Sequence, residues 1–272
     1  MKLALKSLIA SALVAGAVAG QAAVVPIDAA NFVANAGQIT FSEFAIGTIN
    51  PSYTASQYGG STTAPSVSFG SFFTGQSLGV VGTNCAAGTA AGGCIAGTPT
   101  GTLSLDLDNG GGAFIATDTN HTASPVLSGS PFLNGSIAML FSTDQAGISF
   151  DGGFFNAIGS TRITAYGRDG TVLGSITNTA TGIQNLLIGT DDGTSVIAGL
   201  LISLVAPEDA GFTIDSIRFG TISTSGGGGD GGGGGVPTDP PPPNQTPEPT
   251  SLALVGLALL GLGAARRRKN AA

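Results

Sequence analysis

The side chains that most often carry enzyme chemistry are scarce in this 272-residue sequence, which has one histidine and two cysteines. His121 would have to act alone, as a general base or as a metal ligand. A zinc site, an iron–sulfur cluster and a histidine-based catalytic triad each need several such groups, so the composition argues against all three. Residues 119–122, which surround the histidine, are polar and predict an exposed loop.

Cys85 and Cys94 have eight residues between them and stand in a segment rich in glycine and alanine. In an exported protein such a pair is expected to form a disulfide that closes a small loop. Neither cysteine directly follows the N-terminal apolar segment, so nothing in the sequence supports a lipidated or a catalytic cysteine.

Oxygen ligands for a cation are the next chemistry that the spacing suggests. Asp106, Asp108 and Asn109 precede three consecutive glycines, and calcium favours oxygen ligands from such loops. We therefore name these three residues as candidate ligands of a structural calcium ion, and we expect no other cofactor. Residues 151–153 and 191–193 are equally suggestive. Ordinary turns built from aspartate and glycine remain the alternative for all three stretches.

Acidic residues could also act as a general acid and base. A glycoside hydrolase needs two carboxyl groups about 5–10 Å apart. Among the sixteen acidic residues, Glu43 and Glu208 are the only glutamates outside the C-terminal tail. No motif selects a catalytic pair, so we do not expect an enzyme.

Charge is divided between the ends and the middle of the chain. Charged residues make up 9 % of the sequence, against about 25 % in an ordinary soluble domain. The sixteen acidic residues lie between Asp28 and Glu248, whereas six of the nine cations lie near the ends. This separation predicts sorting signals at both ends. The acidic middle is unsuited to nucleic acid, which needs a basic surface.

Residues 1–23 fit a secretory signal peptide. Lys2 and Lys6 precede an apolar stretch over residues 8–18, and small residues follow. This order predicts cleavage after Ala22 or Ala23. An uncleaved anchor helix remains the alternative, although a membrane span normally needs about 20 apolar residues.

Residues 246–269 contain three parts in a fixed order: a Pro-Glu-Pro motif, an apolar segment and a basic cluster. The apolar segment, residues 251–265, would be about 22 Å long as a helix, against about 30 Å for the bilayer core. The basic cluster can still stop transfer and stay in the cytoplasm, so we expect a short C-terminal transmembrane helix. The motif is Pro247, Glu248 and Pro249, and the cluster is Arg266, Arg267, Arg268 and Lys269.

This tail resembles the PEP-CTERM sorting signal of Gram-negative bacteria that make exopolysaccharide. The resemblance implies recognition by an exosortase, an intramembrane cysteine transpeptidase that cleaves near the motif. It further implies export across the inner membrane, transient anchoring in that membrane, and release or transfer to the cell surface. The two prolines would keep the motif extended and accessible to the enzyme. A plain tail anchor remains the alternative.

Between the two signals, residues 24–222 predict one all-β domain and residues 223–245 predict a linker. The linker contains a glycine repeat over residues 226–235 and a proline run over residues 240–243. Neither can recover its ordering entropy by burial, so we expect a disordered spacer between the domain and the membrane.

Short alternating patterns and many glycine-rich turns predict a β-sandwich or jelly roll for the domain. The alternating stretches are residues 39–42, 66–69 and 102–108. Residues 161–166 and 171–173 predict a hairpin that turns at Asp169 and Gly170.

Two further segments suggest how the sheets are built. Residues 197–204 are apolar enough for a central strand. Residues 212–214 and 217–219 alternate in opposite phase on either side of Asp215 and Ser216. This change of phase predicts a β-bulge or a strand that passes between sheets.

Parts of the domain, such as residues 39–41, 67–69, 163–166 and 212–219, also resemble lectin-like sandwich domains of PEP-CTERM proteins. The chain has no tryptophan and three tyrosines, which weakens a role in stacking sugars. We therefore expect a surface or matrix protein with a structural or adhesive role that associates with exopolysaccharide. A carbohydrate- or calcium-binding lectin-like module is the alternative, and a secreted hydrolase is the least favoured function.

Overall fold

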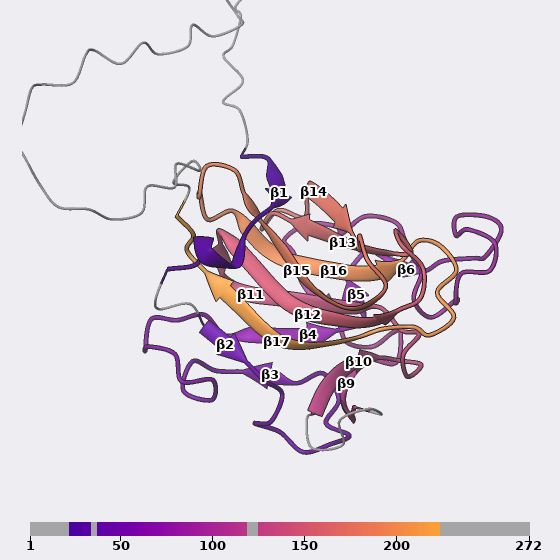
Figure 1. Cartoon of the computed structure of the whole chain (residues 1–272), viewed down its shortest axis with the longest axis horizontal. Helices are drawn as coiled ribbons and strands as arrows, with labels where there is room; N and C mark the ends of the chain where they lie inside the picture. The colour runs from indigo at the N-terminus through magenta and orange to yellow at the C-terminus, as the bar shows by residue number, and fades with distance from the viewer. Residues whose placement is uncertain (1–21, 34–36, 119–124, 224–272) are drawn as a thin grey trace, which may run out of the picture. The chain divides into compact units, whose positions relative to one another are not determined.

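Seventeen strands and one short 3₁₀ helix, η1 (Ala29–Asn31), make up the part of the chain that the structure describes. The structure is a computed structural model, and it describes residues 22–33, 37–118 and 125–223 (Figure 1). The predicted all-β class is confirmed for these residues. The predicted linker and C-terminal helix lie outside them, as does nearly all of the predicted signal peptide. No helix within the described ranges is long and apolar enough to cross a membrane.

Most strands belong to two sheets in which neighbouring strands run antiparallel (Figure 1). The seven-stranded sheet has the order β1 (Val24–Pro26), β15 (Gly182–Thr190), β12 (Gly147–Phe155), β17 (Thr213–Gly220), β10 (Pro125–Gly129), β9 (Ala113–Thr117), with β2 (Gly37–Ile39) also paired to β17. The six-stranded sheet has the order β14 (Val172–Thr177), β13 (Thr161–Tyr166), β16 (Ile197–Leu204), β11 (Ile137–Gln145), β4 (Val67–Gly70), β3 (Ser52–Tyr53).

Both sheets contribute alternate side chains to one large apolar core. Ile148 and Phe150 of β12 belong to this core together with Ile163 of β13 and Met139 of β11. Because residues two apart on a strand share a face, each of these strands turns one face toward the other sheet. The domain is therefore the predicted β-sandwich.

A second apolar cluster lies on the outer face of the six-stranded sheet. It combines Tyr166 and Leu201 of the sheet with Phe72, Phe73 and Leu103 of the chain that crosses this face. Two small ladders belong to that crossing chain: β5 (Phe72–Phe73) with β8 (Leu105–Asp106), and β6 (Ser77–Leu78) with β7 (Ile95–Ala96). The six-stranded sheet is thus covered on both faces, which explains why all eight residues of β16 are buried.

Three predicted elements are confirmed. β16 covers residues 197–204 and lies inside its sheet, between β13 and β11. β13 and β14 form the predicted hairpin, and Gly170 takes the left-handed conformation at φ +83° that its turn requires. The pairing of β17 with β12 skips one residue near Ser216, so the change of phase is a bulge within one sheet.

Two predicted strands are shorter than the alternating pattern suggested. Residues 102–108 pair only over Leu105–Asp106, because the Asp106 carboxylate accepts the backbone N–H groups of Asp108 and Asn109 and ends the strand. Residues 39–42 pair only as far as Ile39, because the Glu43 carboxylate accepts the backbone N–H of Thr40 and turns the chain. These side chain to backbone bonds compete with the ladder, and alternation alone does not reveal them.

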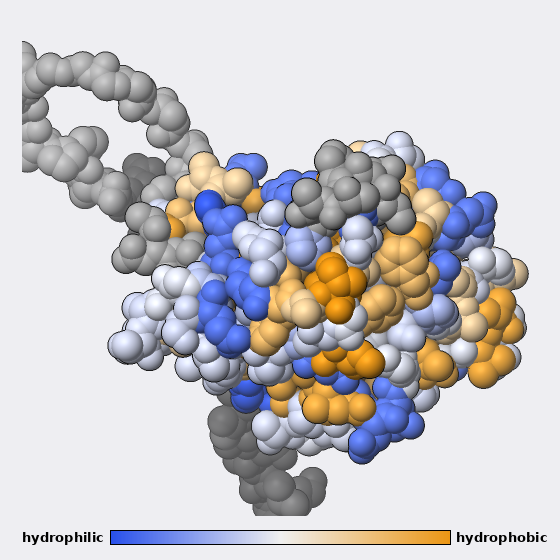
Figure 2. Space-filling model, turned by 90° about the horizontal axis from the view of Figure 1, so that it is seen from below, coloured by the Kyte–Doolittle hydropathy of each residue, from blue (hydrophilic) through white to orange (hydrophobic). Residues whose placement is uncertain are grey.

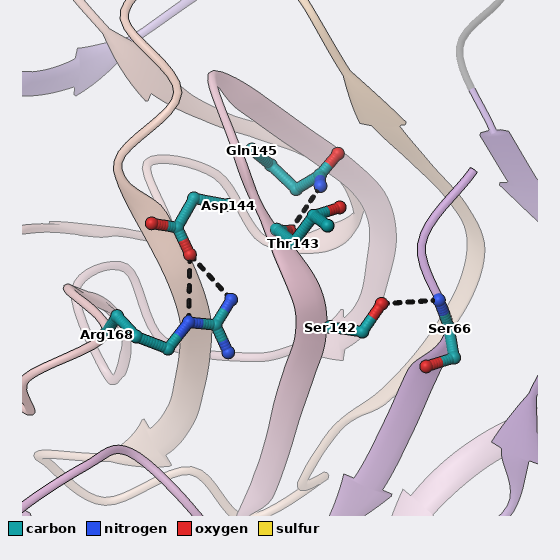
Figure 3. Close-up of polar contacts among 6 residues, drawn as sticks. All are labelled: Ser66, Ser142, Thr143, Asp144, Gln145 and Arg168. Carbon is teal, nitrogen blue, oxygen red and sulfur yellow. Dashed lines mark hydrogen bonds and ion pairs between the residues drawn. The ribbon is translucent and has the colours of Figure 1, made fainter. Parts of the chain in front are cut away.

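Residues near the end of β11 make polar contacts with the residue that precedes β4 and with the turn that follows β13 (Figure 3). The pairing of β11 with β16 is irregular between Leu140 and Gln145. In this irregular stretch Ser142 Oγ accepts the backbone N–H of Ser66 at 2.9 Å. Asp144 Oδ1 accepts two hydrogen bonds from Arg168, at 3.0 Å from Nε and 2.6 Å from Nη2. The ion pair therefore ties the hairpin turn to β11, a strand that β16 separates from β13.

A loop over residues 79–94, which connects β6 to β7, contains the predicted disulfide between Cys85 and Cys94, whose Cα atoms are 6.1 Å apart. We call it the disulfide loop. Its Gly93 carbonyl accepts the backbone N–H of Leu204 at 2.7 Å, and its Gly92 carbonyl accepts that of Ser136 at 3.1 Å. A Cβ atom on Gly93 would lie 2.7 Å from a backbone oxygen of Asn134. Only glycine permits this close approach of the loop to the sheet.

We predict that removing the disulfide by Cys85→Ser with Cys94→Ser lowers the free energy of unfolding by about 2–3 kcal/mol. The bond limits the conformations of the unfolded chain, and the effect follows the length of the closed loop. Denaturant unfolding of oxidised protein and variant measures the difference. Oxidised protein treated with a reductant is the control and should match the variant. An unchanged midpoint would show that the bond does not constrain the unfolded chain.

We also predict that two buried tyrosines resist ionisation in the folded protein. Burial raises the pKa values of Tyr53 and Tyr166 above the ordinary value near 10. The stability that this shift contributes is present below pH ~10 and is lost as the pH rises through the folded-state values. In an alkaline titration, phenolate absorbance from these residues should rise together with the loss of the β-sheet circular dichroism signal. Full phenolate absorbance near pH 10 with the fold intact would contradict this.

Candidate binding groove beside the disulfide loop

A groove with a volume of about 400 Å³ lies between the disulfide loop and the outer face of the six-stranded sheet. This volume is in the range of about 300–1,000 Å³ that small-molecule sites occupy. Its lining residues come from the loop region, from the outer faces of β13, β14 and β16, and from the residue after β16. They are Gln76, Asn84, Cys85, Ala86, Cys94, Ile95, Gly97, Thr98, Arg162, Thr164, Tyr166, Val172, Ser175, Leu201, Ser203, Leu204 and Val205.

The strand register places polar side chains next to one another on the floor of the groove. Thr164 pairs with Ser175 of β14, and Arg162 pairs with Ser203 of β16. The structure gives the hydroxyl groups of Thr164, Ser175 and Ser203 no side-chain hydrogen bond to any described residue. These hydroxyls can each donate and accept, so the floor can bind a ligand rich in hydroxyl groups.

Tyr166 and Gln76 form a fixed polar pair at one side of the groove. Gln76 Nε2 donates to the phenol oxygen of Tyr166 at 3.1 Å, and Gln76 Oε1 accepts the backbone N–H of Phe73 at 3.0 Å. Burial raises the pKa of Tyr166, so the phenol keeps its proton at neutral pH. Because its oxygen already accepts from Gln76, the phenol can donate that proton to another acceptor.

Arg162 is the cation of the groove. It is exposed, and the structure gives it no ion pair with any described residue. No aspartate or glutamate is among the lining residues. Arg168, by contrast, is paired with Asp144 at 2.6 Å. The guanidinium of Arg162 is therefore positioned to bind an anion from outside the domain.

The three candidate calcium ligands lie at the end of β8, outside the groove lining. The Asp106 carboxylate accepts hydrogen bonds from the side-chain amide of Asn109 at 3.0 and 3.1 Å, besides the two backbone bonds described above. Asp106 thus shapes its own turn. No cluster of three or more His, Cys, Asp or Glu in the described ranges could hold a metal ion. The candidate set has two aspartates and one asparagine and is therefore not such a cluster, so the calcium site remains a prediction.

The other two aspartate stretches take different structures. Residues 151–153 were expected in a loop, and that was wrong, because they lie inside β12. Residues 191–193 do form a turn after β15, where Asp192 Oδ1 accepts the backbone N–H of Thr194 at 2.8 Å. This backbone bond lowers the pKa of Asp192.

The buried carboxylate of Glu208 has a structural role. It accepts hydrogen bonds from the backbone N–H groups of Asn156 and Ala157 and from the hydroxyl of Ser160, at 2.7, 3.1 and 2.5 Å. These three donors satisfy a side chain that is only 2 % exposed. Glu208 therefore fixes the connection between β12 and β13, and this network accounts for its burial.

Exposed apolar residues gather on the face of the domain on which β3 and β9 lie (Figure 2). Ile49 forms an isolated antiparallel β-bridge with Phe114 of β9. The ring of Phe114 lies against that of Phe132, with a centroid distance of 6.2 Å. Ile46, Ile49 and Phe132 are between 40 % and 63 % exposed. We call these four residues the β9 apolar patch. Contiguous exposed apolar surface is typical of interaction sites.

The sequence predicted the disulfide beside the groove but not the groove itself. Arg162, Thr164 and Tyr166 alternate along one strand, so period-two patterning places them on one face. Arg162 is also one of three cations between the two terminal signals. The alternation and the rarity of cations could together have identified this face of the strand from the sequence. Gln76 and Ser203, by contrast, are brought to the face only by tertiary contacts.

Several predicted residues lie outside the described ranges: His121, the motif Pro247, Glu248 and Pro249, and the cluster of residues 266–269. The comparisons with known proteins address this tail. The family model described as the PEP-CTERM protein-sorting motif matches residues 245–269. No curated protein and no solved structure matches the chain. Residues 245–269 thus contain a PEP-CTERM sorting motif, which supports export of the chain and sorting to the cell surface by an exosortase.

Proposed function

We propose that this protein is a non-enzymatic component of the cell surface or extracellular matrix that associates with exopolysaccharide. The observation that carries the proposal is the sorting motif at residues 245–269, because it directs the chain to an exosortase and to the surface. The apolar segment after the motif would hold the chain in the inner membrane until cleavage. The domain would then be the part that acts outside the cell.

Two surface features support a structural or adhesive role. The β9 apolar patch exposes large side chains that could contact another macromolecule. The polar groove offers hydroxyl groups, an arginine and a phenol to a hydrated ligand.

A lectin-like module with a defined ligand is the second candidate function. The groove favours it, because its volume of about 400 Å³ and its polar lining fit a small part of a saccharide chain. The two functions differ in selectivity. A matrix component would be retained by the polymer that surrounds the cell, whereas a lectin would discriminate among sugars.

The intact mass of the protein, isolated from its host with and without the exosortase, tests the proposal. We expect the mature protein to lack the signal peptide, and to lack the residues after about Pro249 only when the exosortase is present. Replacing Pro247, Glu248 and Pro249 by alanine should abolish C-terminal cleavage in the wild-type strain. Asp239→Ala in the linker is the matched control and should be cleaved normally.

A full C-terminus in both strains would contradict the proposal and leave a tail-anchored protein. Association with exopolysaccharide needs a second measurement. The mature protein should co-purify with the host's exopolysaccharide and should be released when that polymer is not made. Equal retention in a polymer-deficient strain would contradict a matrix role.

A further inference from the structure

We propose that the groove beside the disulfide loop binds an acidic saccharide, with Arg162 recognising the carboxylate. The inference rests on the proposed association with exopolysaccharide and names the chemical class that the groove would select. It is carried by the contrast between the charge of the domain and the charge of this groove.

The domain as a whole repels anions. Residues 24–222 contain thirteen acidic residues and three arginines, so their net charge is about −10 at neutral pH. An anionic polymer can approach such a surface only where a local cation outweighs the more distant acids. The groove meets this condition, since its lining includes Arg162 and no carboxylate.

The other two arginines of this region are less suited to bind a ligand. Arg168 is joined to Asp144 by two hydrogen bonds, so its guanidinium is already neutralised. Arg218 lies on β17 of the seven-stranded sheet and does not line the groove. Of these three arginines, Arg162 alone lines the groove.

The neighbours of Arg162 match the remaining groups of a sugar acid. A planar guanidinium binds a carboxylate through two parallel hydrogen bonds. Ser203 lies beside Arg162 in the strand register, and Thr164 lies two residues further along the same face. Their hydroxyl groups can bind the ring hydroxyls of a sugar, and Tyr166 can donate one more hydrogen bond.

The size and lining of the groove favour an acidic saccharide over an inorganic anion or a neutral sugar. Its volume of about 400 Å³ is much larger than an inorganic anion needs, given about 30 Å³ for a water molecule. A neutral sugar commonly relies on an exposed aromatic face. Here Tyr166 is 4 % exposed, and its ring packs edge-on against Phe73 at a centroid distance of 5.3 Å. Charge and hydroxyl contacts must therefore supply the selectivity.

The test uses the exported protein purified from its host, with oligogalacturonate as the probe. The fully methyl-esterified oligomer has the same rings and no charge, so it is the matched control ligand. We expect the protein to bind oligogalacturonate, to bind the ester at least roughly tenfold more weakly, and to lose affinity as the salt concentration rises. Calorimetric titration measures each affinity.

Variants then assign the binding to the groove. Arg162→Gln should weaken oligogalacturonate binding roughly tenfold or more, and Arg162→Lys should bind better than the glutamine variant because it keeps the charge. Arg218→Gln is the matched control, an exposed arginine on the other sheet, and should bind like the wild type. Both positions are exposed, so folding should be unchanged, which circular dichroism checks.

Three results would overturn the inference: no binding of oligogalacturonate, equal binding of the ester, or an equal loss of affinity in Arg218→Gln and Arg162→Gln. The proposed function fails separately. If the mature protein is retained by the host's polymer but oligogalacturonate does not bind, the matrix role stands and the groove assignment is wrong. If the groove binds but the protein is not retained, the matrix role is wrong.

Discussion

The structure depends on burial of the six-stranded sheet from both sides. Its inner face packs against the seven-stranded sheet, and its outer face packs against the chain that carries Phe72, Phe73 and Leu103. All eight residues of β16 are therefore removed from water. Burying apolar side chains contributes roughly 1.5–3 kcal/mol each. For a chain with few charged residues and many glycines, this double burial makes a large contribution to stability.

The same arrangement creates the groove. The crossing chain covers only part of the outer face, and beyond Tyr166 the face becomes polar at Thr164 and Arg162. Backbone bonds from Leu204 to Gly93 and from Ser136 to Gly92 hold the disulfide loop over this polar region. The wall of the groove is thus fixed by the sheet that forms its floor. A rigid site of this kind needs little ordering when a ligand binds.

The sequence correctly predicted those elements whose structure depends on residues close together in the chain. The apolar run of β16, the hairpin turning at Gly170 and the bulge at Ser216 each follow from a few neighbouring residues. The alternation in residues 102–108 predicted a longer strand than the structure has. The Asp106 carboxylate accepts hydrogen bonds from the turn that follows it, and Leu103 belongs to the second core. That core, and the approach of Gln76 to Tyr166, depend on contacts across 90 residues. Periodicity does not encode which segment covers which face.

In the proposed function, the sorting tail and the domain have separate roles. The tail decides where the protein goes, and the groove is the part of the described surface best suited to a polar ligand. Hydrogen exchange of the mature protein, with and without the host's exopolysaccharide, tests this division most directly. We expect protection on binding that is confined to residues 76–98, to β13 and β14, and to residues 201–205 at the end of β16. Protection centred on the β9 apolar patch, or none at all, would contradict it.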